Sequence, residues 1–132
     1  IIVTELPYVV NKARLIETER FDVEGCDAFY GMVCGIIAQD HDITEIFVDA
    51  TFKIVGRNYD EFAELIKKLS KVSEENETDI VFTVSEDIEK LPEALFEYAQ
   101  KIWIDLNWPK TLCRCREFFI GKIYFSYWQN YF

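Results

Sequence analysis

The sequence predicts a single α+β domain over residues 1–132, with a mixed β-sheet and about three helices. Three observations support this fold class. The chain has 132 residues, which is long enough for one domain with its own core, and half of the residues are apolar. Stretches with a period of two residues also alternate with stretches of helical period, most clearly in a β-α-β core unit at residues 43–84.

Residues 1–10 read as a strand that Pro7 places at a sheet edge or bends, because proline has no N–H to donate. The run IIVTELPYVVNKARLIE, from Ile1 to Glu17, resembles a segment of DNA gyrase A subunits and related type IIA topoisomerases. It departs at Val9, where that family usually has Gln, and the similarity stops after Glu17. The motif that holds the family's nucleophilic tyrosine has no counterpart here, so the resemblance implies no catalytic residue. Because the chain begins at Ile1 and not at Met, we expect a fragment or a processed product.

Residues 13–23 fit either a strand or, over residues 11–17, a short helix, since neither alternating set of side chains is cleanly apolar. Residues 26–39 predict a helix with an apolar stripe, and Asp27 near its start suits the helix dipole. Gly31 and Gly35 weaken this helix by about 1 kcal/mol each relative to Ala. We therefore expect another element to approach closely, in a groove of small residues.

The core unit begins with a predicted strand over residues 46–54, in which every second residue is apolar and which ends at Gly56. Asn58 is a helix cap with Glu61 three residues later, and apolar positions from Tyr59 to Val72 follow at helical spacing. Residues 79–84 form a short apolar run typical of a buried strand. A parallel pair of strands requires a right-handed crossover, and an antiparallel pair with the helix laid across it is the alternative.

A third helix is predicted after Ser85, with Pro92 early in it and an end at residues 107–109. Residues 118–120 and 123–125 flank Gly121-Lys122, which predicts a C-terminal hairpin. The tail at residues 111–132 is rich in aromatic residues. We expect these aromatics in the core, and if they are exposed they form an interface through which a homo-oligomer assembles.

The net charge is −10, and residues 1–100 carry −13 of it while residues 101–132 carry +3. An acidic body repels phosphate, so nucleic-acid binding through it is disfavoured and a basic partner is favoured. No apolar run is long enough to span a membrane, so no membrane contact is expected. Four cysteines in a chain of this size do not indicate a disulfide scaffold, and a cytoplasmic location follows as the expectation.

Two function classes follow. The first is a small acidic binding or inhibitor-type module, similar in principle to immunity proteins and nucleic-acid mimics, that engages a basic protein through Asp40, Asp42, Glu74, Glu75 and Glu77. The alternative is a small enzyme or divalent-metal-binding domain that uses the Asp40-His41-Asp42 loop. The first class is favoured, because no known catalytic motif occurs in the sequence.

The enzymatic alternative rests on a few side chains. His41, the only histidine, and Cys34, with Cys26 as a second thiol, are the catalytic candidates, because a base beside a thiol raises the thiolate fraction. Asp40, Asp42 and Asp49 are the candidate metal ligands, since carboxylates suit Mg²⁺ or Ca²⁺. Solvated acids, a surface histidine and inert thiols are the favoured interpretation of all of them. Glycine-rich phosphate loops are absent from the sequence, so no cofactor is expected.

Overall fold

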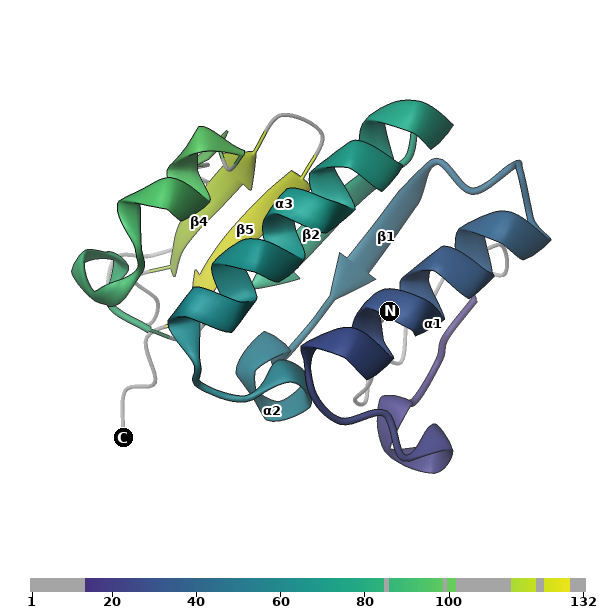
Figure 1. Cartoon of the computed structure of the whole chain (residues 1–132), viewed down its shortest axis with the longest axis horizontal. Helices are drawn as coiled ribbons and strands as arrows, with labels where there is room; N and C mark the ends of the chain where they lie inside the picture. The colour runs from purple at the N-terminus through teal and green to yellow at the C-terminus, as the bar shows by residue number, and fades with distance from the viewer. Residues whose placement is uncertain (1–13, 85, 99, 102–114, 121–122, 129–132) are drawn as a thin grey trace.

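The computed structural model describes residues 14–84, 86–98, 100–101, 115–120 and 123–128 (Figure 1). Its helical elements, in chain order, are η1 (Thr18–Phe21), α1 (Cys26–Gln39), α2 (Thr51–Val55), α3 (Tyr59–Asn76), η2 (Ile88–Lys90) and η3 (Glu93–Glu97), where η marks a 3-10 helix. The strands are β1 (Glu45–Val48), β2 (Asp79–Thr83), β3 (Gln100–Lys101), β4 (Cys115–Ile120) and β5 (Ile123–Trp128). Among these residues no helix is both long and apolar enough to cross a membrane.

The five strands form one mixed sheet in the order β1-β2-β5-β3-β4. β1 pairs with β2 in parallel, and β2 pairs with β5 in parallel. β4 runs antiparallel to β5, which confirms the C-terminal hairpin, although its turn lies outside the described residues. The α+β class and the β-α-β core unit are therefore confirmed, and the antiparallel alternative for the two core strands is wrong.

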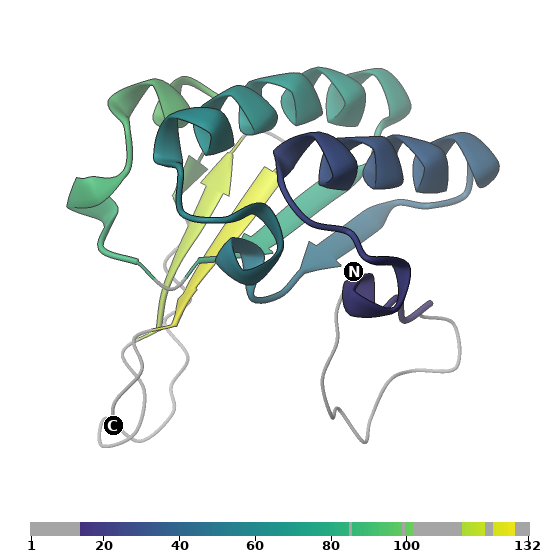
Figure 2. The ribbon, with the colours of Figure 1, turned by 60° about the horizontal axis from the view of Figure 1, so that its bottom comes forward.

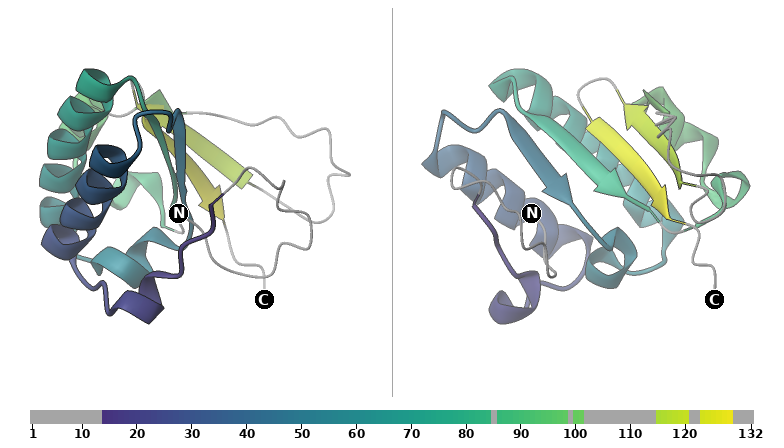
Figure 3. Two further views of the ribbon diagram at one scale, coloured as in Figure 1. Left: turned by 90° about the vertical axis from the view of Figure 1, so that its right-hand side faces the viewer. Right: turned by 180° about the vertical axis from the view of Figure 1, so that it is seen from behind.

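α1 and α3 lie side by side over one face of the sheet (Figure 2). Seen from the side and from behind, the opposite face carries no described helix (Figure 3). The core fills the space between helices and sheet, and it is built from alternate strand residues and from one stripe of each helix. Its fully buried members include Phe29, Val33, Val48, Phe62, Ile66, Leu69, Ile80 and Phe82. Edge-to-face contacts join Phe82 to Phe29 and Phe62, with ring centroids 6.2 and 6.1 Å apart.

The two long helices agree closely with their predictions. α1 spans the predicted residues 26–39. α3 begins after Asn58, whose Oδ1 accepts a hydrogen bond from the Glu61 backbone N–H at 3.3 Å, as the capping pattern predicts. Local signals are sufficient to predict these two helices, because the apolar stripes and the cap lie within the helices or next to them.

The predicted strand over residues 46–54 is wrong in its second half. β1 ends at Val48, Ala50 takes a left-handed conformation with φ of 50°, and residues 51–55 form the short helix α2. A strand and a helical turn can both bury Phe52 and Ile54, so the apolar alternation continues across a real boundary.

Three further predictions are corrected. Residues 14–23 form neither the strand nor the helix but only the 3-10 turn η1. The helix predicted beyond Ser85 is replaced by η2, η3 and the strand β3, and its remainder lies outside the described residues. The groove around Gly31 and Gly35 is absent, because a Cβ at either position would meet no atom within 4 Å.

Candidate functional site

The acids predicted to bind a partner meet at one end of the molecule. α1 leads through a short loop into β1, and α3 leads through a shorter one into β2. Both helices therefore run against the two parallel strands, and the C-terminal ends of the helices lie beside the first residues of the strands (Figure 1). Asp40 and Asp42 lie in the first loop, and Glu74, Glu75 and Glu77 lie at the end of α3.

Hydrogen bonds hold these two loops together. The Asp79 backbone N–H donates to the Thr44 carbonyl oxygen at 2.8 Å, and Thr78 Oγ1 donates to the Ile43 carbonyl oxygen at 2.9 Å. Ser73 Oγ, which is fully buried, donates to the Thr78 carbonyl oxygen at 2.6 Å. The backbone that carries the acids is consequently a fixed frame and not two independent loops.

We call the seven carboxylates of this region the acidic end: Asp40, Asp42, Glu45, Glu74, Glu75, Glu77 and Asp79. Residues 39–45 and 72–79 contain no lysine or arginine. Five of the seven side chains are exposed, and those of Asp40 and Asp79 are half-buried. The site therefore presents concentrated negative charge on a rigid support.

The backbone adds to this charge. A helix C-terminus carries roughly half a negative elementary charge, and both α1 and α3 end here. The last turn of α3 contains no basic residue that would offset its dipole. Glu45 and Asp79 are register partners on the adjacent strands β1 and β2, a position where like charges repel.

The described ion pairs neutralise little of the acidic end. Arg14 Nη2 lies 3.9 Å from Asp40 Oδ2, and Lys71 Nζ lies 3.9 Å from Glu75 Oε1. Both pairs are long and solvent-exposed, a geometry that contributes little to stability. Most of the negative charge is thus available to an external cation.

Glu45 and Asp79 were missed as site residues in the sequence. Each is the first residue of its strand, and a parallel register of β1 and β2 brings them side by side. Asp79 opens the strand predicted over residues 79–84, and Glu45 directly precedes the one predicted over residues 46–54. That the two acids lie side by side depends on the parallel pairing.

The structure does not assemble the predicted nucleophile. His41 is exposed and makes no hydrogen bond or ion pair in the described part of the chain. Cys34 is a free thiol whose neighbour is Tyr30, and hydrogen bonding to Cys34 raises the pKa of Tyr30. Cys26 begins α1 at the far end of that helix from His41; burial raises the pKa of its thiol, and the nearby Glu61 and Asp27 raise it further. The raised pKa of Cys26 favours its inert thiol over the reactive thiolate.

The predicted metal ligands do not converge either. Asp40 and Asp42 precede β1, whereas Asp49 follows it and accepts a hydrogen bond from Thr83 Oγ1 at 2.5 Å. No group of three or more His, Cys, Asp or Glu side chains within the described ranges is arranged to hold a metal ion.

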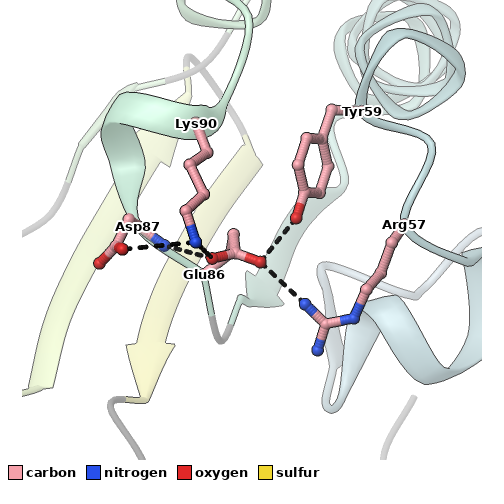
Figure 4. A network of polar contacts seen from close by, with 5 residues as sticks. All are labelled: Arg57, Tyr59, Glu86, Asp87 and Lys90. Carbon is pink, nitrogen blue, oxygen red and sulfur yellow. Dashed lines mark hydrogen bonds and ion pairs between the residues drawn. The ribbon is translucent and has the colours of Figure 1, made fainter.

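A second polar cluster lies at the opposite end of α3 (Figure 4). Glu86 Oε2 accepts hydrogen bonds from Tyr59 Oη at 2.6 Å and from Arg57 Nη1 at 2.8 Å. Glu86 Oε1 accepts from Lys90 Nζ at 2.8 Å and from the Asp87 backbone N–H at 3.1 Å. The bonds from Lys90 and Tyr59 lower the pKa of Glu86 to about 2. All four bonds are internal, so this cluster is a structural tie between distant segments.

No protein-family model, curated protein or solved structure shows significant similarity to this chain. The resemblance of residues 1–17 to gyrase A subunits stays a prediction, and residues 1–13 lie outside the described part of the structure. The side chains of the aromatic tail lie outside it as well, so the predicted oligomer interface is also untested.

Proposed function

We propose that this protein is a small binding module that captures a basic protein partner through the acidic end. The observation that carries the proposal is the meeting of seven carboxylates from two loops, two strands and a helix terminus, in segments that contain no lysine or arginine. This arrangement favours lysine-rich or arginine-rich surfaces and repels nucleic-acid phosphates.

The acids occupy positions where they destabilise the fold. Glu74 and Glu75 lie in the last turn of α3, where each acid opposes the helix dipole by about 0.3–1 kcal/mol. Glu77 has φ of 52°, a left-handed conformation that glycine or asparagine adopts more easily. These acids lower the stability of the fold and have few internal partners. Contact with a cationic surface would explain why they occupy these positions.

The mode of action that fits is electrostatic capture. Complementary charge accelerates encounter and selects the partner, and an acidic surface that occupies a basic functional site blocks that site, as inhibitor-type proteins do. A cytoplasmic location is part of the proposal, supported by the free thiols of Cys26 and Cys34.

A binding assay with a fluorescent oligolysine peptide tests the proposal. The triple variant Glu74→Gln, Glu75→Gln, Glu77→Gln is expected to bind about tenfold more weakly at low salt, and with a shallower salt dependence. The matched control is Glu89→Gln, Glu93→Gln, Glu97→Gln, which removes the same charge from exposed acids on η2 and η3. Equal weakening by both triples would show that only net charge matters and would overturn the proposed site.

Thermal or urea unfolding of the same two variants gives an independent readout. Relief of the α3 dipole is expected to raise the free energy of unfolding of the first triple by about 1 kcal/mol at low ionic strength, whereas the control gains nothing of this kind. A destabilised first triple would contradict the assignment of these acids to binding at the expense of stability.

A further inference from the structure

The outer edge of β1 presents backbone groups that have no partner among the described residues. β1 is the first strand in the sheet order, so β2 is its only neighbouring strand in the part of the chain that the structure describes. The Asp79 N–H donates to the carbonyl oxygen of Thr44, the residue before its register partner Glu45. In a parallel ladder, alternate residues of a strand direct their backbone groups to the same neighbour. The backbone groups of Ile46 therefore face β2, and those of Glu45 and Phe47 face away from it. Neither Glu45 nor Phe47 makes any other hydrogen bond in the described part of the chain.

The side chains of these two residues are also accessible. Phe47 is 46% exposed and is one of only three large hydrophobic residues that are exposed in the described chain. Glu45 is exposed two residues earlier, so both side chains project from the sheet face that α1 and α3 leave uncovered (Figure 3). The free edge thus combines unpaired backbone groups, one acid and one apolar side chain.

We infer that an extended segment of the basic partner adds to the free edge of β1 as a further strand. This inference rests on the proposed function and specifies how the partner is held. The backbone groups of Glu45 and Phe47 supply main-chain hydrogen bonds, as in other cases of strand addition. Asp42 and Glu45 supply charge complementarity, because the acidic end begins at this edge.

The spacing of the two side chains defines the segment that fits. Residues on one face of a strand recur every second position. The partner segment therefore places a lysine or arginine beside Glu45 and, two residues away, an apolar residue beside Phe47. A second copy of this chain is a poor occupant, since edge pairing would bring two acidic ends together on chains with net charge −10 each.

Peptides with selectively methylated backbone amides test the inference. The parent peptide repeats Lys-Thr-Val-Thr, so that lysine and valine share one face. Two derivatives carry N-methyl groups on alternate amides, one on the odd set and one on the even set. Strand addition predicts that one derivative binds about tenfold more weakly than the parent and that the other binds as the parent does, because only one set of amides faces β1.

The outcomes separate the two proposals. If both derivatives bind as tightly as the parent, strand addition is overturned while electrostatic capture stands. If the parent peptide fails to bind at low salt, or binds the Glu74, Glu75 and Glu77 glutamine triple as well as the original protein, both proposals fall. Self-association of the peptide-free protein in sedimentation, abolished by Phe47→Lys, would assign the edge to a second copy and overturn the inference.

A protein variant provides the matched test. Phe47→Thr keeps a residue that favours strands but removes the exposed ring, and we expect it to weaken peptide binding severalfold with no loss of folded structure. Phe21→Thr is the control, because Phe21 is 67% exposed and lies in η1, which is not part of the sheet. Equal peptide affinity of the two variants would overturn the role of Phe47.

Discussion

At the scale of single residues, two buried threonines show that a hydroxyl group can either raise or lower the free energy of unfolding. Thr51 and Thr78 are both 1% exposed. Thr78 Oγ1 donates to the Ile43 carbonyl oxygen, whereas Thr51 Oγ1 finds no hydrogen-bond partner in the part of the chain that the structure describes. A buried hydroxyl without a partner costs about 1–3 kcal/mol, and a paired one contributes to stability.

The same substitution should therefore have opposite effects at the two positions. We expect Thr51→Val to raise the free energy of unfolding by about 1 kcal/mol, because the shape is kept and the unpaired hydroxyl is removed. Thr78→Val should lower it by about 1–2 kcal/mol, because the Ile43 carbonyl loses its donor. Urea denaturation of both variants checks this, and two shifts of equal sign would contradict it.

At the scale of elements, α1 carries two glycines that its packing does not require. Gly31 and Gly35 lie on the exposed side of the helix, with no atom within 4 Å of the position that a Cβ would take. Glycine in a helix interior costs about 1 kcal/mol relative to alanine, because the unfolded chain is freer. Gly56 also has open space around it, but its φ of 82° is one that alanine adopts only with strain.

Three alanine substitutions distinguish the effect of open space around a glycine from the effect of its backbone conformation. Gly31→Ala and Gly35→Ala are each expected to raise the free energy of unfolding by about 0.5–1 kcal/mol. Gly56→Ala should lower it by about 1–2 kcal/mol, since a positive φ combined with an extended ψ is a conformation that only glycine adopts without strain. Thermal unfolding followed by circular dichroism distinguishes the signs. Destabilisation by Gly31→Ala would indicate that α1 closely contacts another element after all.

At the scale of the whole molecule, the acidic end lies at the C-terminus of α3, whereas Glu86, a carboxylate with four hydrogen bonds, lies near its start. With 18 residues, α3 is about 27 Å long. At its start, Glu86 joins the α2–α3 connection to the segment that follows β2, through bonds to Arg57 and Tyr59 (Figure 4). Its pKa of about 2, against an ordinary value of 4.5, means that the folded state holds the ionised form.

This pairing predicts how stability depends on pH. The pKa of Glu86 is lower in the folded state than in the unfolded state, so its contribution is complete above about pH 4.5 and is lost as pH falls toward about 2. We expect Glu86→Gln to be less stable than the original protein by about 1 kcal/mol at neutral pH, with a difference that shrinks through this window. Urea denaturation at several pH values measures it.

Glu89→Gln is the control for this prediction. Glu89 is exposed on η2, three residues beyond Glu86, and it makes no hydrogen bond or ion pair in the described part of the chain. Its substitution should leave the stability difference near zero at every pH. A pH-independent deficit in Glu86→Gln would show that the carboxylate charge is not what ties the two segments together.

Several elements can be predicted from the sequence because their signals are local. α1, the capped start of α3, the strand β2 and the terminal hairpin follow from periodicity, a side-chain cap and a turn, and each of these lies within a few residues. Charge alone predicts that Asp40, Asp42, Glu74, Glu75 and Glu77 bind a partner, and this role stays a prediction.

Three features depend on contacts between distant parts of the chain: where β1 ends, which strands are neighbours, and which acids share a surface. Phe52 and Ile54 are buried equally well by a strand or by α2, so the reversal at Ala50 cannot be read from alternation. The position of Glu45 beside Asp79, and of the loop before β1 beside the loop before β2, depends on the parallel pairing of these two strands. That pairing is stabilised by core contacts between residues far apart in the chain, and a local pattern contains no information about them.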